Sequence, residues 1–339
     1  MATIKDVAKL AGVSTSTVSR ALSRKVRVED ATREKVLEAV ARLDYHPNSL
    51  ARGLRDGFTR TLAMVIPEIT NPFFPKLVQC VEKRADERGY SLILCDSGGN
   101  PAREKRHIEE LRSDRVDGVL FIGINDCDCA ERIALLRDGG IPAVLVNRSF
   151  DLGVDCVTND NRRGAREIVA RLIRMGHRRI ACLVMAPESQ HYRQRLEGCL
   201  QAFAENGIDG YQQYLVPDVR GIDDAYRATR RLLERRERPT AFFAFVDIIA
   251  FGVYSGIYGN GLSIPDDVSV AGFDDIATSQ HMSPPLTTYK HPVERIAETA
   301  VERLMRRIQR RAGAEPARIE IRGRLIVRPS IRRVRECAG

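Results

Sequence analysis

The sequence predicts two unlike parts, an N-terminal all-α helix-turn-helix module and a large α/β domain of two lobes with parallel sheets. Three observations predict this division. Short helical patterns broken by a glycine occupy residues 1–46, positive charge is concentrated in residues 1–60, and from residue 61 apolar strand-like runs alternate with amphipathic helices. At 339 residues the chain is also too long for one ordinary core.

The composition is that of a soluble globular protein, with 43% hydrophobic and 29% charged residues. No apolar run approaches the roughly 18–20 residues that span a bilayer, and the first residues show no secretory signal. We therefore expect a cytoplasmic protein that has no membrane partner. The eight cysteines lack metal-ligand spacing, and we expect them to be reduced and packed as small hydrophobic residues.

Positive charge is unevenly placed along the chain. The net charge is +9, and residues 1–60 carry 12 Lys and Arg against 7 Asp and Glu. A basic module at one end favours a polyanionic partner, because DNA binding gains free energy from the release of counterions. A solvated charged surface explains the charge as well, so charge alone leaves both interpretations open.

Three short helices are predicted in the N-terminal module, over residues 3–10, 15–22 and 31–43. Thr3, Ser14 and Asp30 are the expected N-caps, and Gly12 ends the first helix. The helical spacing predicts a shared core formed by Ile4, Val7, Ala8, Ala11, Val18, Ala21, Leu22, Val36, Leu37, Val40 and Leu43.

The second of these helices has the character of a DNA-reading helix. Two short helices joined by a glycine-containing turn, braced by a third, form a helix-turn-helix. Small hydroxyl side chains on the outer face let the backbone approach a groove closely, and arginine can read the O6 and N7 edge of guanine. The residues expected to contact DNA are Ser14, Thr15, Ser16, Thr17 and Arg20.

The N-terminal sequence carries a recognisable signature. The segment TIKDVAKLAGVS at residues 3–14, followed by STVSR at residues 16–20, closely resembles the signature of the LacI (lactose/galactose repressor) family. The match is long and ungapped. The resemblance implies a sequence-specific DNA-binding transcriptional regulator, usually a repressor, that binds an operator as a homodimer and is controlled by a small-molecule effector.

Residues 47–60 are predicted to form a hinge helix and linker. Pro47 ends the third helix, and Asn48 can cap a short helix over residues 49–55, which is too short to be stable alone in water. The resemblance implies that this helix orders on DNA and inserts a leucine into the minor groove. Leu54 matches that position, so we expect it to contact DNA. An ordinary tether is the alternative.

The effector-binding and dimerisation domain is expected at residues 61–339. Strand-like runs occupy residues 61–67, 91–96, 118–123, 143–147, 179–185, 213–216, 241–247 and 268–273, and helical stretches include residues 74–88, 103–112 and 130–138. This alternation predicts parallel sheets covered on both faces, with ligands at the carboxyl ends of the strands. The domain resembles the periplasmic sugar-binding-protein fold of the family, through the segments DNRRGA at 160–165, GHRRI at 176–180, GFDD at 272–275 and PPLTT at 284–288.

The effector cleft is predicted partly from the residues and partly from the resemblance. Asn71, Phe73 and Phe74 follow the first strand, where aromatic rings can stack on a ligand; two core phenylalanines are the alternative. Arg148, Arg195 and Asp274 match ligand positions of the family, although each could instead form a surface ion pair. With His291, these seven residues are the expected effector-binding set.

Departures from the family pattern predict the class of effector. The family often has Asp at Asn147, an aromatic residue near Val219 or Arg220, Asn at Val246 and Gln at His291. A typical sugar site would therefore lose a carboxylate, a stacking ring and an amide, while the arginines remain. This favours an effector with anionic character, such as a sugar acid or a phosphorylated sugar.

No catalytic constellation, cofactor or metal site is expected. The sequence has no nucleophile elbow, Walker loop or HExxH motif, and the glycines at residues 252–261 fit a helix interior and its C-terminal loop. No apolar heptads follow the last strand, so we expect a dimer. Two alternatives remain: a DNA-binding regulator with a degenerate effector cleft, and a sugar-binding receptor with no DNA role.

Overall fold

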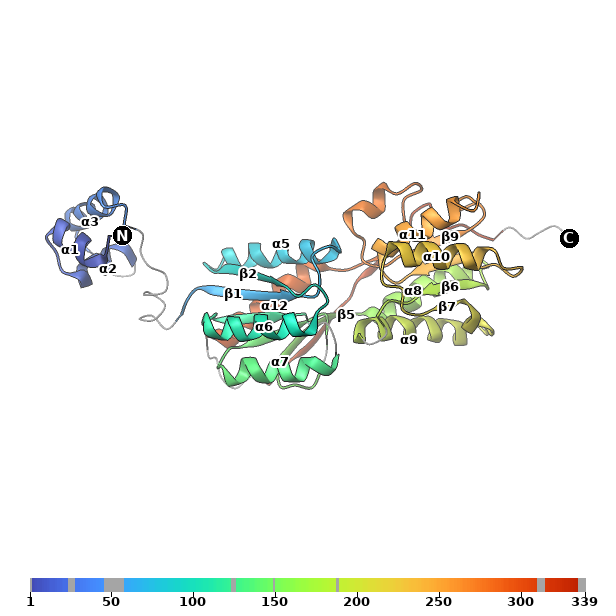
Figure 1. Ribbon diagram of the computed structural model, residues 1–339, viewed down its shortest axis with the longest axis horizontal. Coiled ribbons are helices and arrows are strands. Elements are labelled where there is room, and N and C mark those ends of the chain that lie inside the picture. Colours follow the sequence, from blue (N-terminus) through green and yellow to red (C-terminus); the bar gives the residue numbers. More distant parts are fainter. Residues whose placement is uncertain are drawn as a thin grey trace. The chain divides into compact units, whose positions relative to one another are not determined.

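The computed structural model describes residues 2–23, 28–45, 58–122, 126–148, 150–186, 189–309 and 315–334. The chain divides into two compact units, residues 1–59 and 60–339 (Figure 1). A unit in which the described residues form three helices, followed by a two-lobed α/β unit, confirms the predicted fold class. The predicted domain boundary at residue 46, the hinge helix and Leu54 lie outside the described residues.

The N-terminal unit contains α1 (Ile4–Ala11), α2 (Thr15–Ser23) and α3 (Asp30–Arg42). Thr3 caps α1 as predicted, in a capping box: the Asp6 N–H donates to Thr3 Oγ1, and the Thr3 N–H donates to the Asp6 carboxylate at 2.8 Å. Gly12 adopts a left-handed conformation, with φ of 67°, that turns the chain toward α2. The core centres on Val7, Val18 and Val36, all 0% exposed.

Two expectations for α3 are wrong. The helix begins at Asp30 itself, and the capping position falls on Glu29, which makes no side-chain cap hydrogen bond. Leu37 was expected in the core but is 50% exposed. Once Val36 and Ala39 define the buried stripe, Leu37 lies about 100° around the helix from Val36 and points to the surface.

The first lobe of the α/β unit is built on a six-stranded parallel sheet. Its strands, in spatial order, are β11 (Arg318–Ile321), β5 (Asp155–Asn159), β4 (Ala143–Val146), β3 (Gly118–Phe121), β1 (Thr61–Ile66) and β2 (Ser91–Asp96). Helices α5 (Phe73–Asp86) and α12 (Val293–Ile308) cover one face, and α6 (Pro101–Ser113) and α7 (Asp126–Asp138) cover the other. Side chains of β1 alternate between the two cores because successive residues of a strand point to opposite faces.

The second lobe has a four-stranded parallel sheet, in the order β7 (Leu215–Val216), β6 (Ile180–Leu183), β8 (Ala241–Ala244) and β9 (Ser269–Ala271). Helix α8 (Asn161–Arg174) packs beside α9 (Gln190–Glu205), and α10 (Ile222–Leu233) packs beside α11 (Asp247–Tyr258). Strands β10 (Thr288–Lys290) and β12 (Arg324–Ile326) form an antiparallel ribbon. Each predicted strand-like run contains a strand, although residues 211–214 form a 3-10 turn that shortens the run at 213–216.

The chain passes between the lobes three times. The three crossovers are residues 159–161 between β5 and α8, residues 290–293 between β10 and α12, and residues 321–324 between β11 and β12. The first lobe therefore takes its helix α12 and its edge strand β11 from the last part of the chain. The hydrophobic periodicity predicts the elements but not this exchange between lobes.

Candidate nucleic-acid interface and ligand cleft

The N-terminus of α2 carries a cluster of hydroxyl groups. Ser14 Oγ accepts from the Thr17 N–H at 3.1 Å, as its predicted capping role requires. The same oxygen lies 2.7 Å from Ser16 Oγ and 2.9 Å from Thr17 Oγ1. Ser14, Thr15 and Ser16 are exposed, and Thr17 is half-buried. These four predicted DNA contacts thus lie together on one accessible helix end.

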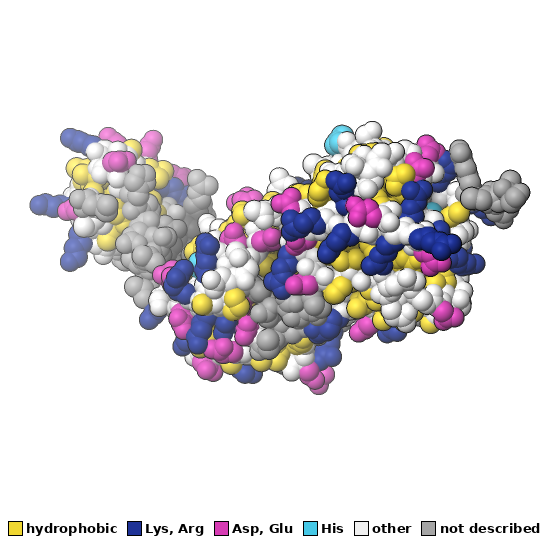
Figure 2. Space-filling model, turned by 45° about the vertical axis from the view of Figure 1, so that its right-hand side comes forward, with side chains coloured by type: hydrophobic (Ala, Val, Ile, Leu, Met, Phe, Trp, Pro, Cys, Tyr) yellow, Lys and Arg dark blue, Asp and Glu magenta, His cyan; other side chains and the backbone are white. Residues whose placement is uncertain are grey.

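Arg20 lies one turn further along α2 and is exposed. Its Nε is 3.3 Å from the Ser16 carbonyl oxygen, and its Nη2 is 3.4 Å from Ser16 Oγ, so the side chain folds back over the hydroxyl cluster. Helix α2 contains no Asp or Glu, whereas acidic and basic side chains are interspersed over the visible face of the α/β unit (Figure 2). The outer face of α2 therefore carries small polar side chains and one positive charge, that of Arg20.

Two adjoining cavities lie where the lobes of the α/β unit face each other. The first cavity, about 590 Å³, is lined by Phe74, Asp96 and Arg148 of the first lobe, and by Ser189, His191 and Tyr192 of the second. The second cavity, about 640 Å³, is lined among others by Asn71, Ile222, Ile248 and Ile249. Both cavities share Glu68, Thr70, Met185 and Arg220. They form one continuous cleft of the size that takes a small molecule.

The first cavity combines a buried cation with carboxylates. Arg148 is 2% exposed, and its Nη2 lies 3.5 Å from Ser189 Oγ across the cleft. His191 Nδ1 is buried and has no hydrogen-bond partner in the described chain, and burial together with the charge of Arg148 lowers the pKa of His191 well below its usual value. Burial raises the pKa of Glu68. The wall of this cavity therefore offers a ligand both a cationic donor and carboxyl acceptors.

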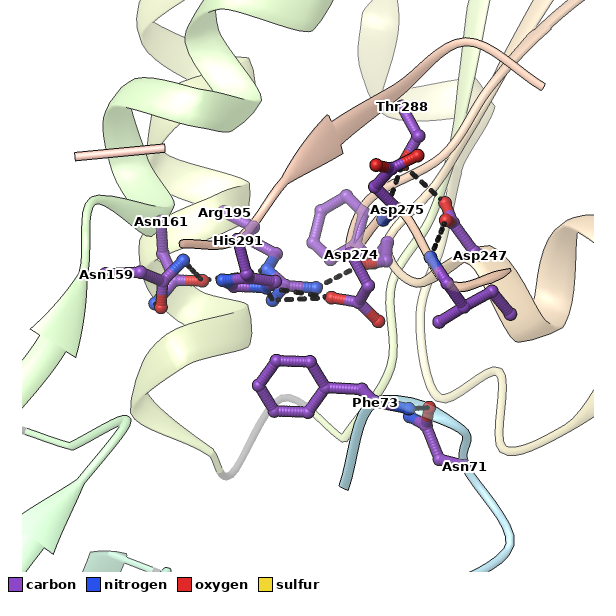
Figure 3. Close-up of polar contacts among 12 residues, drawn as sticks. Asn71, Phe73, Asn159, Asn161, Arg195, Asp247, Asp274, Asp275, Thr288 and His291 are labelled. Carbon is purple, nitrogen blue, oxygen red and sulfur yellow. Dashed lines mark hydrogen bonds and ion pairs between the residues drawn. The ribbon is translucent and has the colours of Figure 1, made fainter. Parts of the chain in front are cut away.

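A second group of predicted residues forms a buried cluster around Arg195 (Figure 3). The Arg195 guanidinium donates from Nε to Asn161 Oδ1 at 2.9 Å and from Nη1 to the Phe245 carbonyl, and its Nη2 lies 3.4 Å from Asp274 Oδ1. Its Cζ lies 3.8 Å from the centre of the Phe273 ring. Burial lowers the pKa of Arg195, and Asp274 opposes this effect. Arg195 and Asp274 are thus an ion pair whose side chains are 2% and 4% exposed.

His291 completes this cluster of Arg195, Asp274, His291 and Phe73. We name it the effector cluster because all four residues belong to the predicted effector-binding set, although none of them lines either cavity. His291 Nε2 lies 2.9 Å from Asp274 Oδ1 and 3.2 Å from Arg195 Nη2, and the His291 ring centre is 4.8 Å from that of Phe73. Its Nδ1 is buried without a partner in the described chain. Burial lowers the pKa of His291 although Asp274 opposes the shift. When Nε2–H donates to Asp274, Nδ1 carries no hydrogen and can only accept a hydrogen bond.

The structure divides the seven predicted effector residues between these places. Phe74 and Arg148 line the first cavity, and Asn71 lines the second, where its Oδ1 accepts from the Phe73 N–H at 3.1 Å. The other four form the effector cluster. The residues that sequence reasoning missed are Glu68, Asp96, Ser189, His191 and Tyr192. Asp96 ends β2 and Ser189 follows β6, so the rule that ligands bind at carboxyl ends of parallel strands could have indicated both.

The described residues were compared with the requirements of a metal site and of a membrane-spanning helix. Within them, no three His, Cys, Asp or Glu side chains come together as a metal site. No described helix is both long and apolar enough to cross a bilayer.

Comparisons with known proteins match both units. Residues 3–48 match the family of bacterial regulatory proteins called the lacI family, and residues 59–329 match the periplasmic binding proteins and sugar binding domain of the LacI family. The chain is 36% identical over 333 residues to the HTH-type transcriptional repressor PurR of Photobacterium profundum, covering 98% of this chain and 99% of that protein. It is 38% identical over 309 residues to the ribose operon repressor of Escherichia coli, and the match covers 91% of this chain and 93% of that protein.

A solved structure matches nearly the full length of the chain. The lac repressor dimer bound to operator and the anti-inducer ONPF has a TM-score of 0.88 with this chain at 27% identity, and the match covers 98% of this chain and 99% of that one.

Proposed function

The chain belongs to the LacI family of bacterial regulatory proteins, DNA-binding repressors controlled by small-molecule effectors, and we propose which of its residues perform each task. The relatives are repressors, not enzymes. A homodimer places two N-terminal units on the two halves of an operator, as the lac repressor dimer is bound to its operator.

Base reading is assigned to the outer face of α2. The small side chains at its N-terminal end let the helix approach the major groove closely; they are those of Ser14, Thr15, Ser16 and Thr17. Arg20 exchanges its hydrogen bonds to Ser16 for hydrogen bonds to a guanine base. The observation that supports this assignment is an exposed helix face of hydroxyls and one arginine, without a carboxylate to repel phosphate. We retain Leu54 as the proposed minor-groove wedge, on the basis of its place in the sequence.

A genome-wide selection of DNA fragments with the full-length protein tests this function. We expect one enriched pseudo-palindromic motif, and footprinting should show protection on both half-sites. A protein that enriches no fragment over random competitor, with or without metabolites, would contradict the assignment. That result would instead favour a sugar-binding receptor with no DNA role.

We propose that the effector is an anionic, polyhydroxylated molecule, such as a sugar acid or a phosphorylated sugar. The supporting observation is Arg148, a cation that is 2% exposed in the wall of the first cavity, with His191 beside it and Asp96 available to accept from hydroxyls. In the effector cluster, Arg195, Asp274 and His291 supply further polar contacts once a ligand rearranges them. Asn71, Phe73 and Phe74 supply the apolar and amide contacts.

Calorimetric titration with a matched series of ribose, ribonate and ribose 5-phosphate tests the effector class. We expect an anionic member to bind at least about tenfold more tightly than ribose, equivalent to about 1.4 kcal/mol. Arg148→Gln should remove the preference, and the exposed Arg231→Gln should keep it. A preference for neutral ribose would contradict an anionic effector, and no binding across a wider metabolite screen would favour a degenerate cleft.

A further inference from the structure

The three crossovers meet at one buried carboxylate, that of Asp160. Asp160 is 3% exposed and directly precedes α8, yet its side chain makes no capping hydrogen bond to that helix, although aspartate at this position usually caps its own helix. The Tyr289 hydroxyl donates to Asp160 Oδ2 at 2.9 Å, and the Gly323 N–H donates to Oδ1 at 3.0 Å. One side chain in the first crossover thus binds Tyr289, which directly precedes the second crossover, and Gly323 in the third.

The packing around Tyr289 holds its hydroxyl on this carboxylate. Tyr289 is 0% exposed. A Cβ at Gly323 would lie 2.5 Å from Tyr289 Cε1 and 2.6 Å from the Lys290 carbonyl oxygen, and a Cβ at Gly164 would lie 2.7 Å from the Tyr289 ring. Neither position has room for a side chain, so both glycine backbones pack directly against the Cδ1–Cε1 edge of the Tyr289 ring.

The same ring reaches the effector cluster. The ring centres of Tyr289 and Phe273 are 5.1 Å apart, with planes inclined by 32°. Phe273 in turn contacts the Arg195 guanidinium, whose Cζ lies 3.8 Å from the ring centre, and the His291 ring, whose centre is 5.2 Å away. A continuous series of contacts therefore runs from Asp160 through Tyr289 and Phe273 to Arg195.

We propose that Asp160 is a positioning residue that couples the effector cluster to the three crossovers, acting through Tyr289 and Phe273 on Arg195. The inference rests on the proposed function. With both hydrogen bonds present, a shift of Arg195 on ligand binding displaces all three crossovers together, and with them the angle between the lobes. Without the Tyr289 hydroxyl, the second crossover moves independently of the first, so the coupling between the cleft and the operator falls while the contacts at each site remain.

Reciprocity allows this coupling to be measured without knowledge of the effector, because operator binding must alter the cleft if the cleft alters operator binding. The full-length protein is used, with an operator fragment recovered by the genomic selection. Hydrogen exchange of the amides at residues 189–196 is compared with and without the fragment. Tyr289→Phe is the test variant, and Tyr214→Phe, which removes another buried tyrosine hydroxyl that donates to the Glu237 carbonyl at 2.9 Å, is the matched control.

We expect the wild type and Tyr214→Phe to show the same operator-dependent change in exchange rate. In Tyr289→Phe this change should fall by about fivefold or more, the lower end of typical couplings, while the Kd for the fragment stays within about threefold. Asp160→Asn, which weakens both hydrogen bonds, should act in the same direction.

Two results would overturn the inference, and they are distinguishable. An undiminished change in both Tyr289→Phe and Asp160→Asn, with the selected fragment still bound, refutes the coupling role and leaves the proposed function intact. A wild type that selects no fragment refutes the proposed function, and the coupling role with it.

Discussion

Asp247 shows how burial changes the chemistry of a single residue. It is 0% exposed and accepts hydrogen bonds from the Ile276 N–H at 3.1 Å, and from Ser279 Oγ and Thr288 Oγ1 at 2.6 Å each. Burial and the nearby charge of Asp274 nevertheless raise its pKa to about 7. The carboxyl therefore takes up a proton in the folded state at a pH where the unfolded chain has already lost it.

The free energy of unfolding of the α/β unit should therefore depend on pH through Asp247. The folded pKa of Asp247 lies above its unfolded value of about 4. Its contribution to the free energy of unfolding therefore falls as pH rises from about 4 to about 7, by at most about 1.4 kcal/mol per pH unit. Asp247→Asn should remove this slope. Urea unfolding at a series of pH values measures it.

The difference between wild type and variant is the quantity to compare. His177, His191 and His291 have lowered pKa values, so their contributions are lost as pH falls and oppose that of Asp247. Surface Asp209→Asn is the control. Identical slopes for wild type and Asp247→Asn would show that Asp247 does not titrate in this range.

Arg20 carries the second prediction at the residue scale. Arg20→Ala should weaken operator binding by about 1–3 kcal/mol and relax discrimination at one base pair of each half-site. Arg42→Ala, at the exposed end of α3, should leave base discrimination unchanged. Binding selections with randomised half-sites measure both. A uniform loss across all sequences in the Arg20 variant would mean that Arg20 contacts phosphate.

Among the elements, α10 and α11 depend on glycine for their close packing. A Cβ at Gly252 would lie 2.1 Å from the Ile222 carbonyl oxygen and 2.9 Å from Ala225 Cβ. Gly256 faces Thr229 in the same way, so two glycines one turn apart let the helix backbones approach. This confirms the sequence prediction that these glycines belong to a helix interior.

Replacing Gly252 by alanine should therefore destabilise the second lobe. Overpacking of this kind costs about 1–3 kcal/mol, which exceeds the gain of up to about 1 kcal/mol that alanine brings to a helix. Gly221→Ser is the control and should not destabilise the protein, because a Cβ there meets open space and serine suits the N-cap position of α10. Thermal unfolding measures both variants. A Gly252→Ala protein as stable as wild type would show that α10 and α11 separate easily.

The local hydrophobic and capping patterns of the sequence predict most helices and strands, and each wrong or missing prediction has a local cause. The capping box at Thr3 and the cap at Ser14 were predictable because they involve residues three positions apart. The run at 213–216 begins with a 3-10 turn. The predicted runs also omit four strands, β5, β10, β11 and β12, of which β10 and β12 are three residues each, too short for a period of two to be recognised. Leu37 was placed in the core because its apolar side chain neighbours the buried Val36.

At the scale of the whole molecule, the two units have separate cores. The core of the N-terminal unit is small, centred on Val7, Val18 and Val36, and the α/β unit has its own cores. Small cores give marginal stability. The N-terminal unit should therefore unfold independently of the α/β unit.

A single core substitution should separate the two functions. Val18→Ala, at a side chain that is 0% exposed, should destabilise the N-terminal unit by about 2 kcal/mol. Operator binding should weaken while effector binding in the cleft stays unchanged. Scanning calorimetry should show the lower transition moving and the upper one fixed. Movement of both transitions by the same amount would show that the units unfold as one.

The sequence by itself determined the two-part architecture, the hydroxyl-rich end of α2 and eight of the strands, because each depends on residues a few positions apart. Only the tertiary structure decided which side chains form the effector cluster: Asp274 and His291 lie 79 and 96 positions from Arg195. It also decided that α12 and β11 return to the first lobe and that Asp160 joins the crossovers. Such contacts depend on how completed elements pack against one another, and the periodicity of a single segment holds no information about that packing.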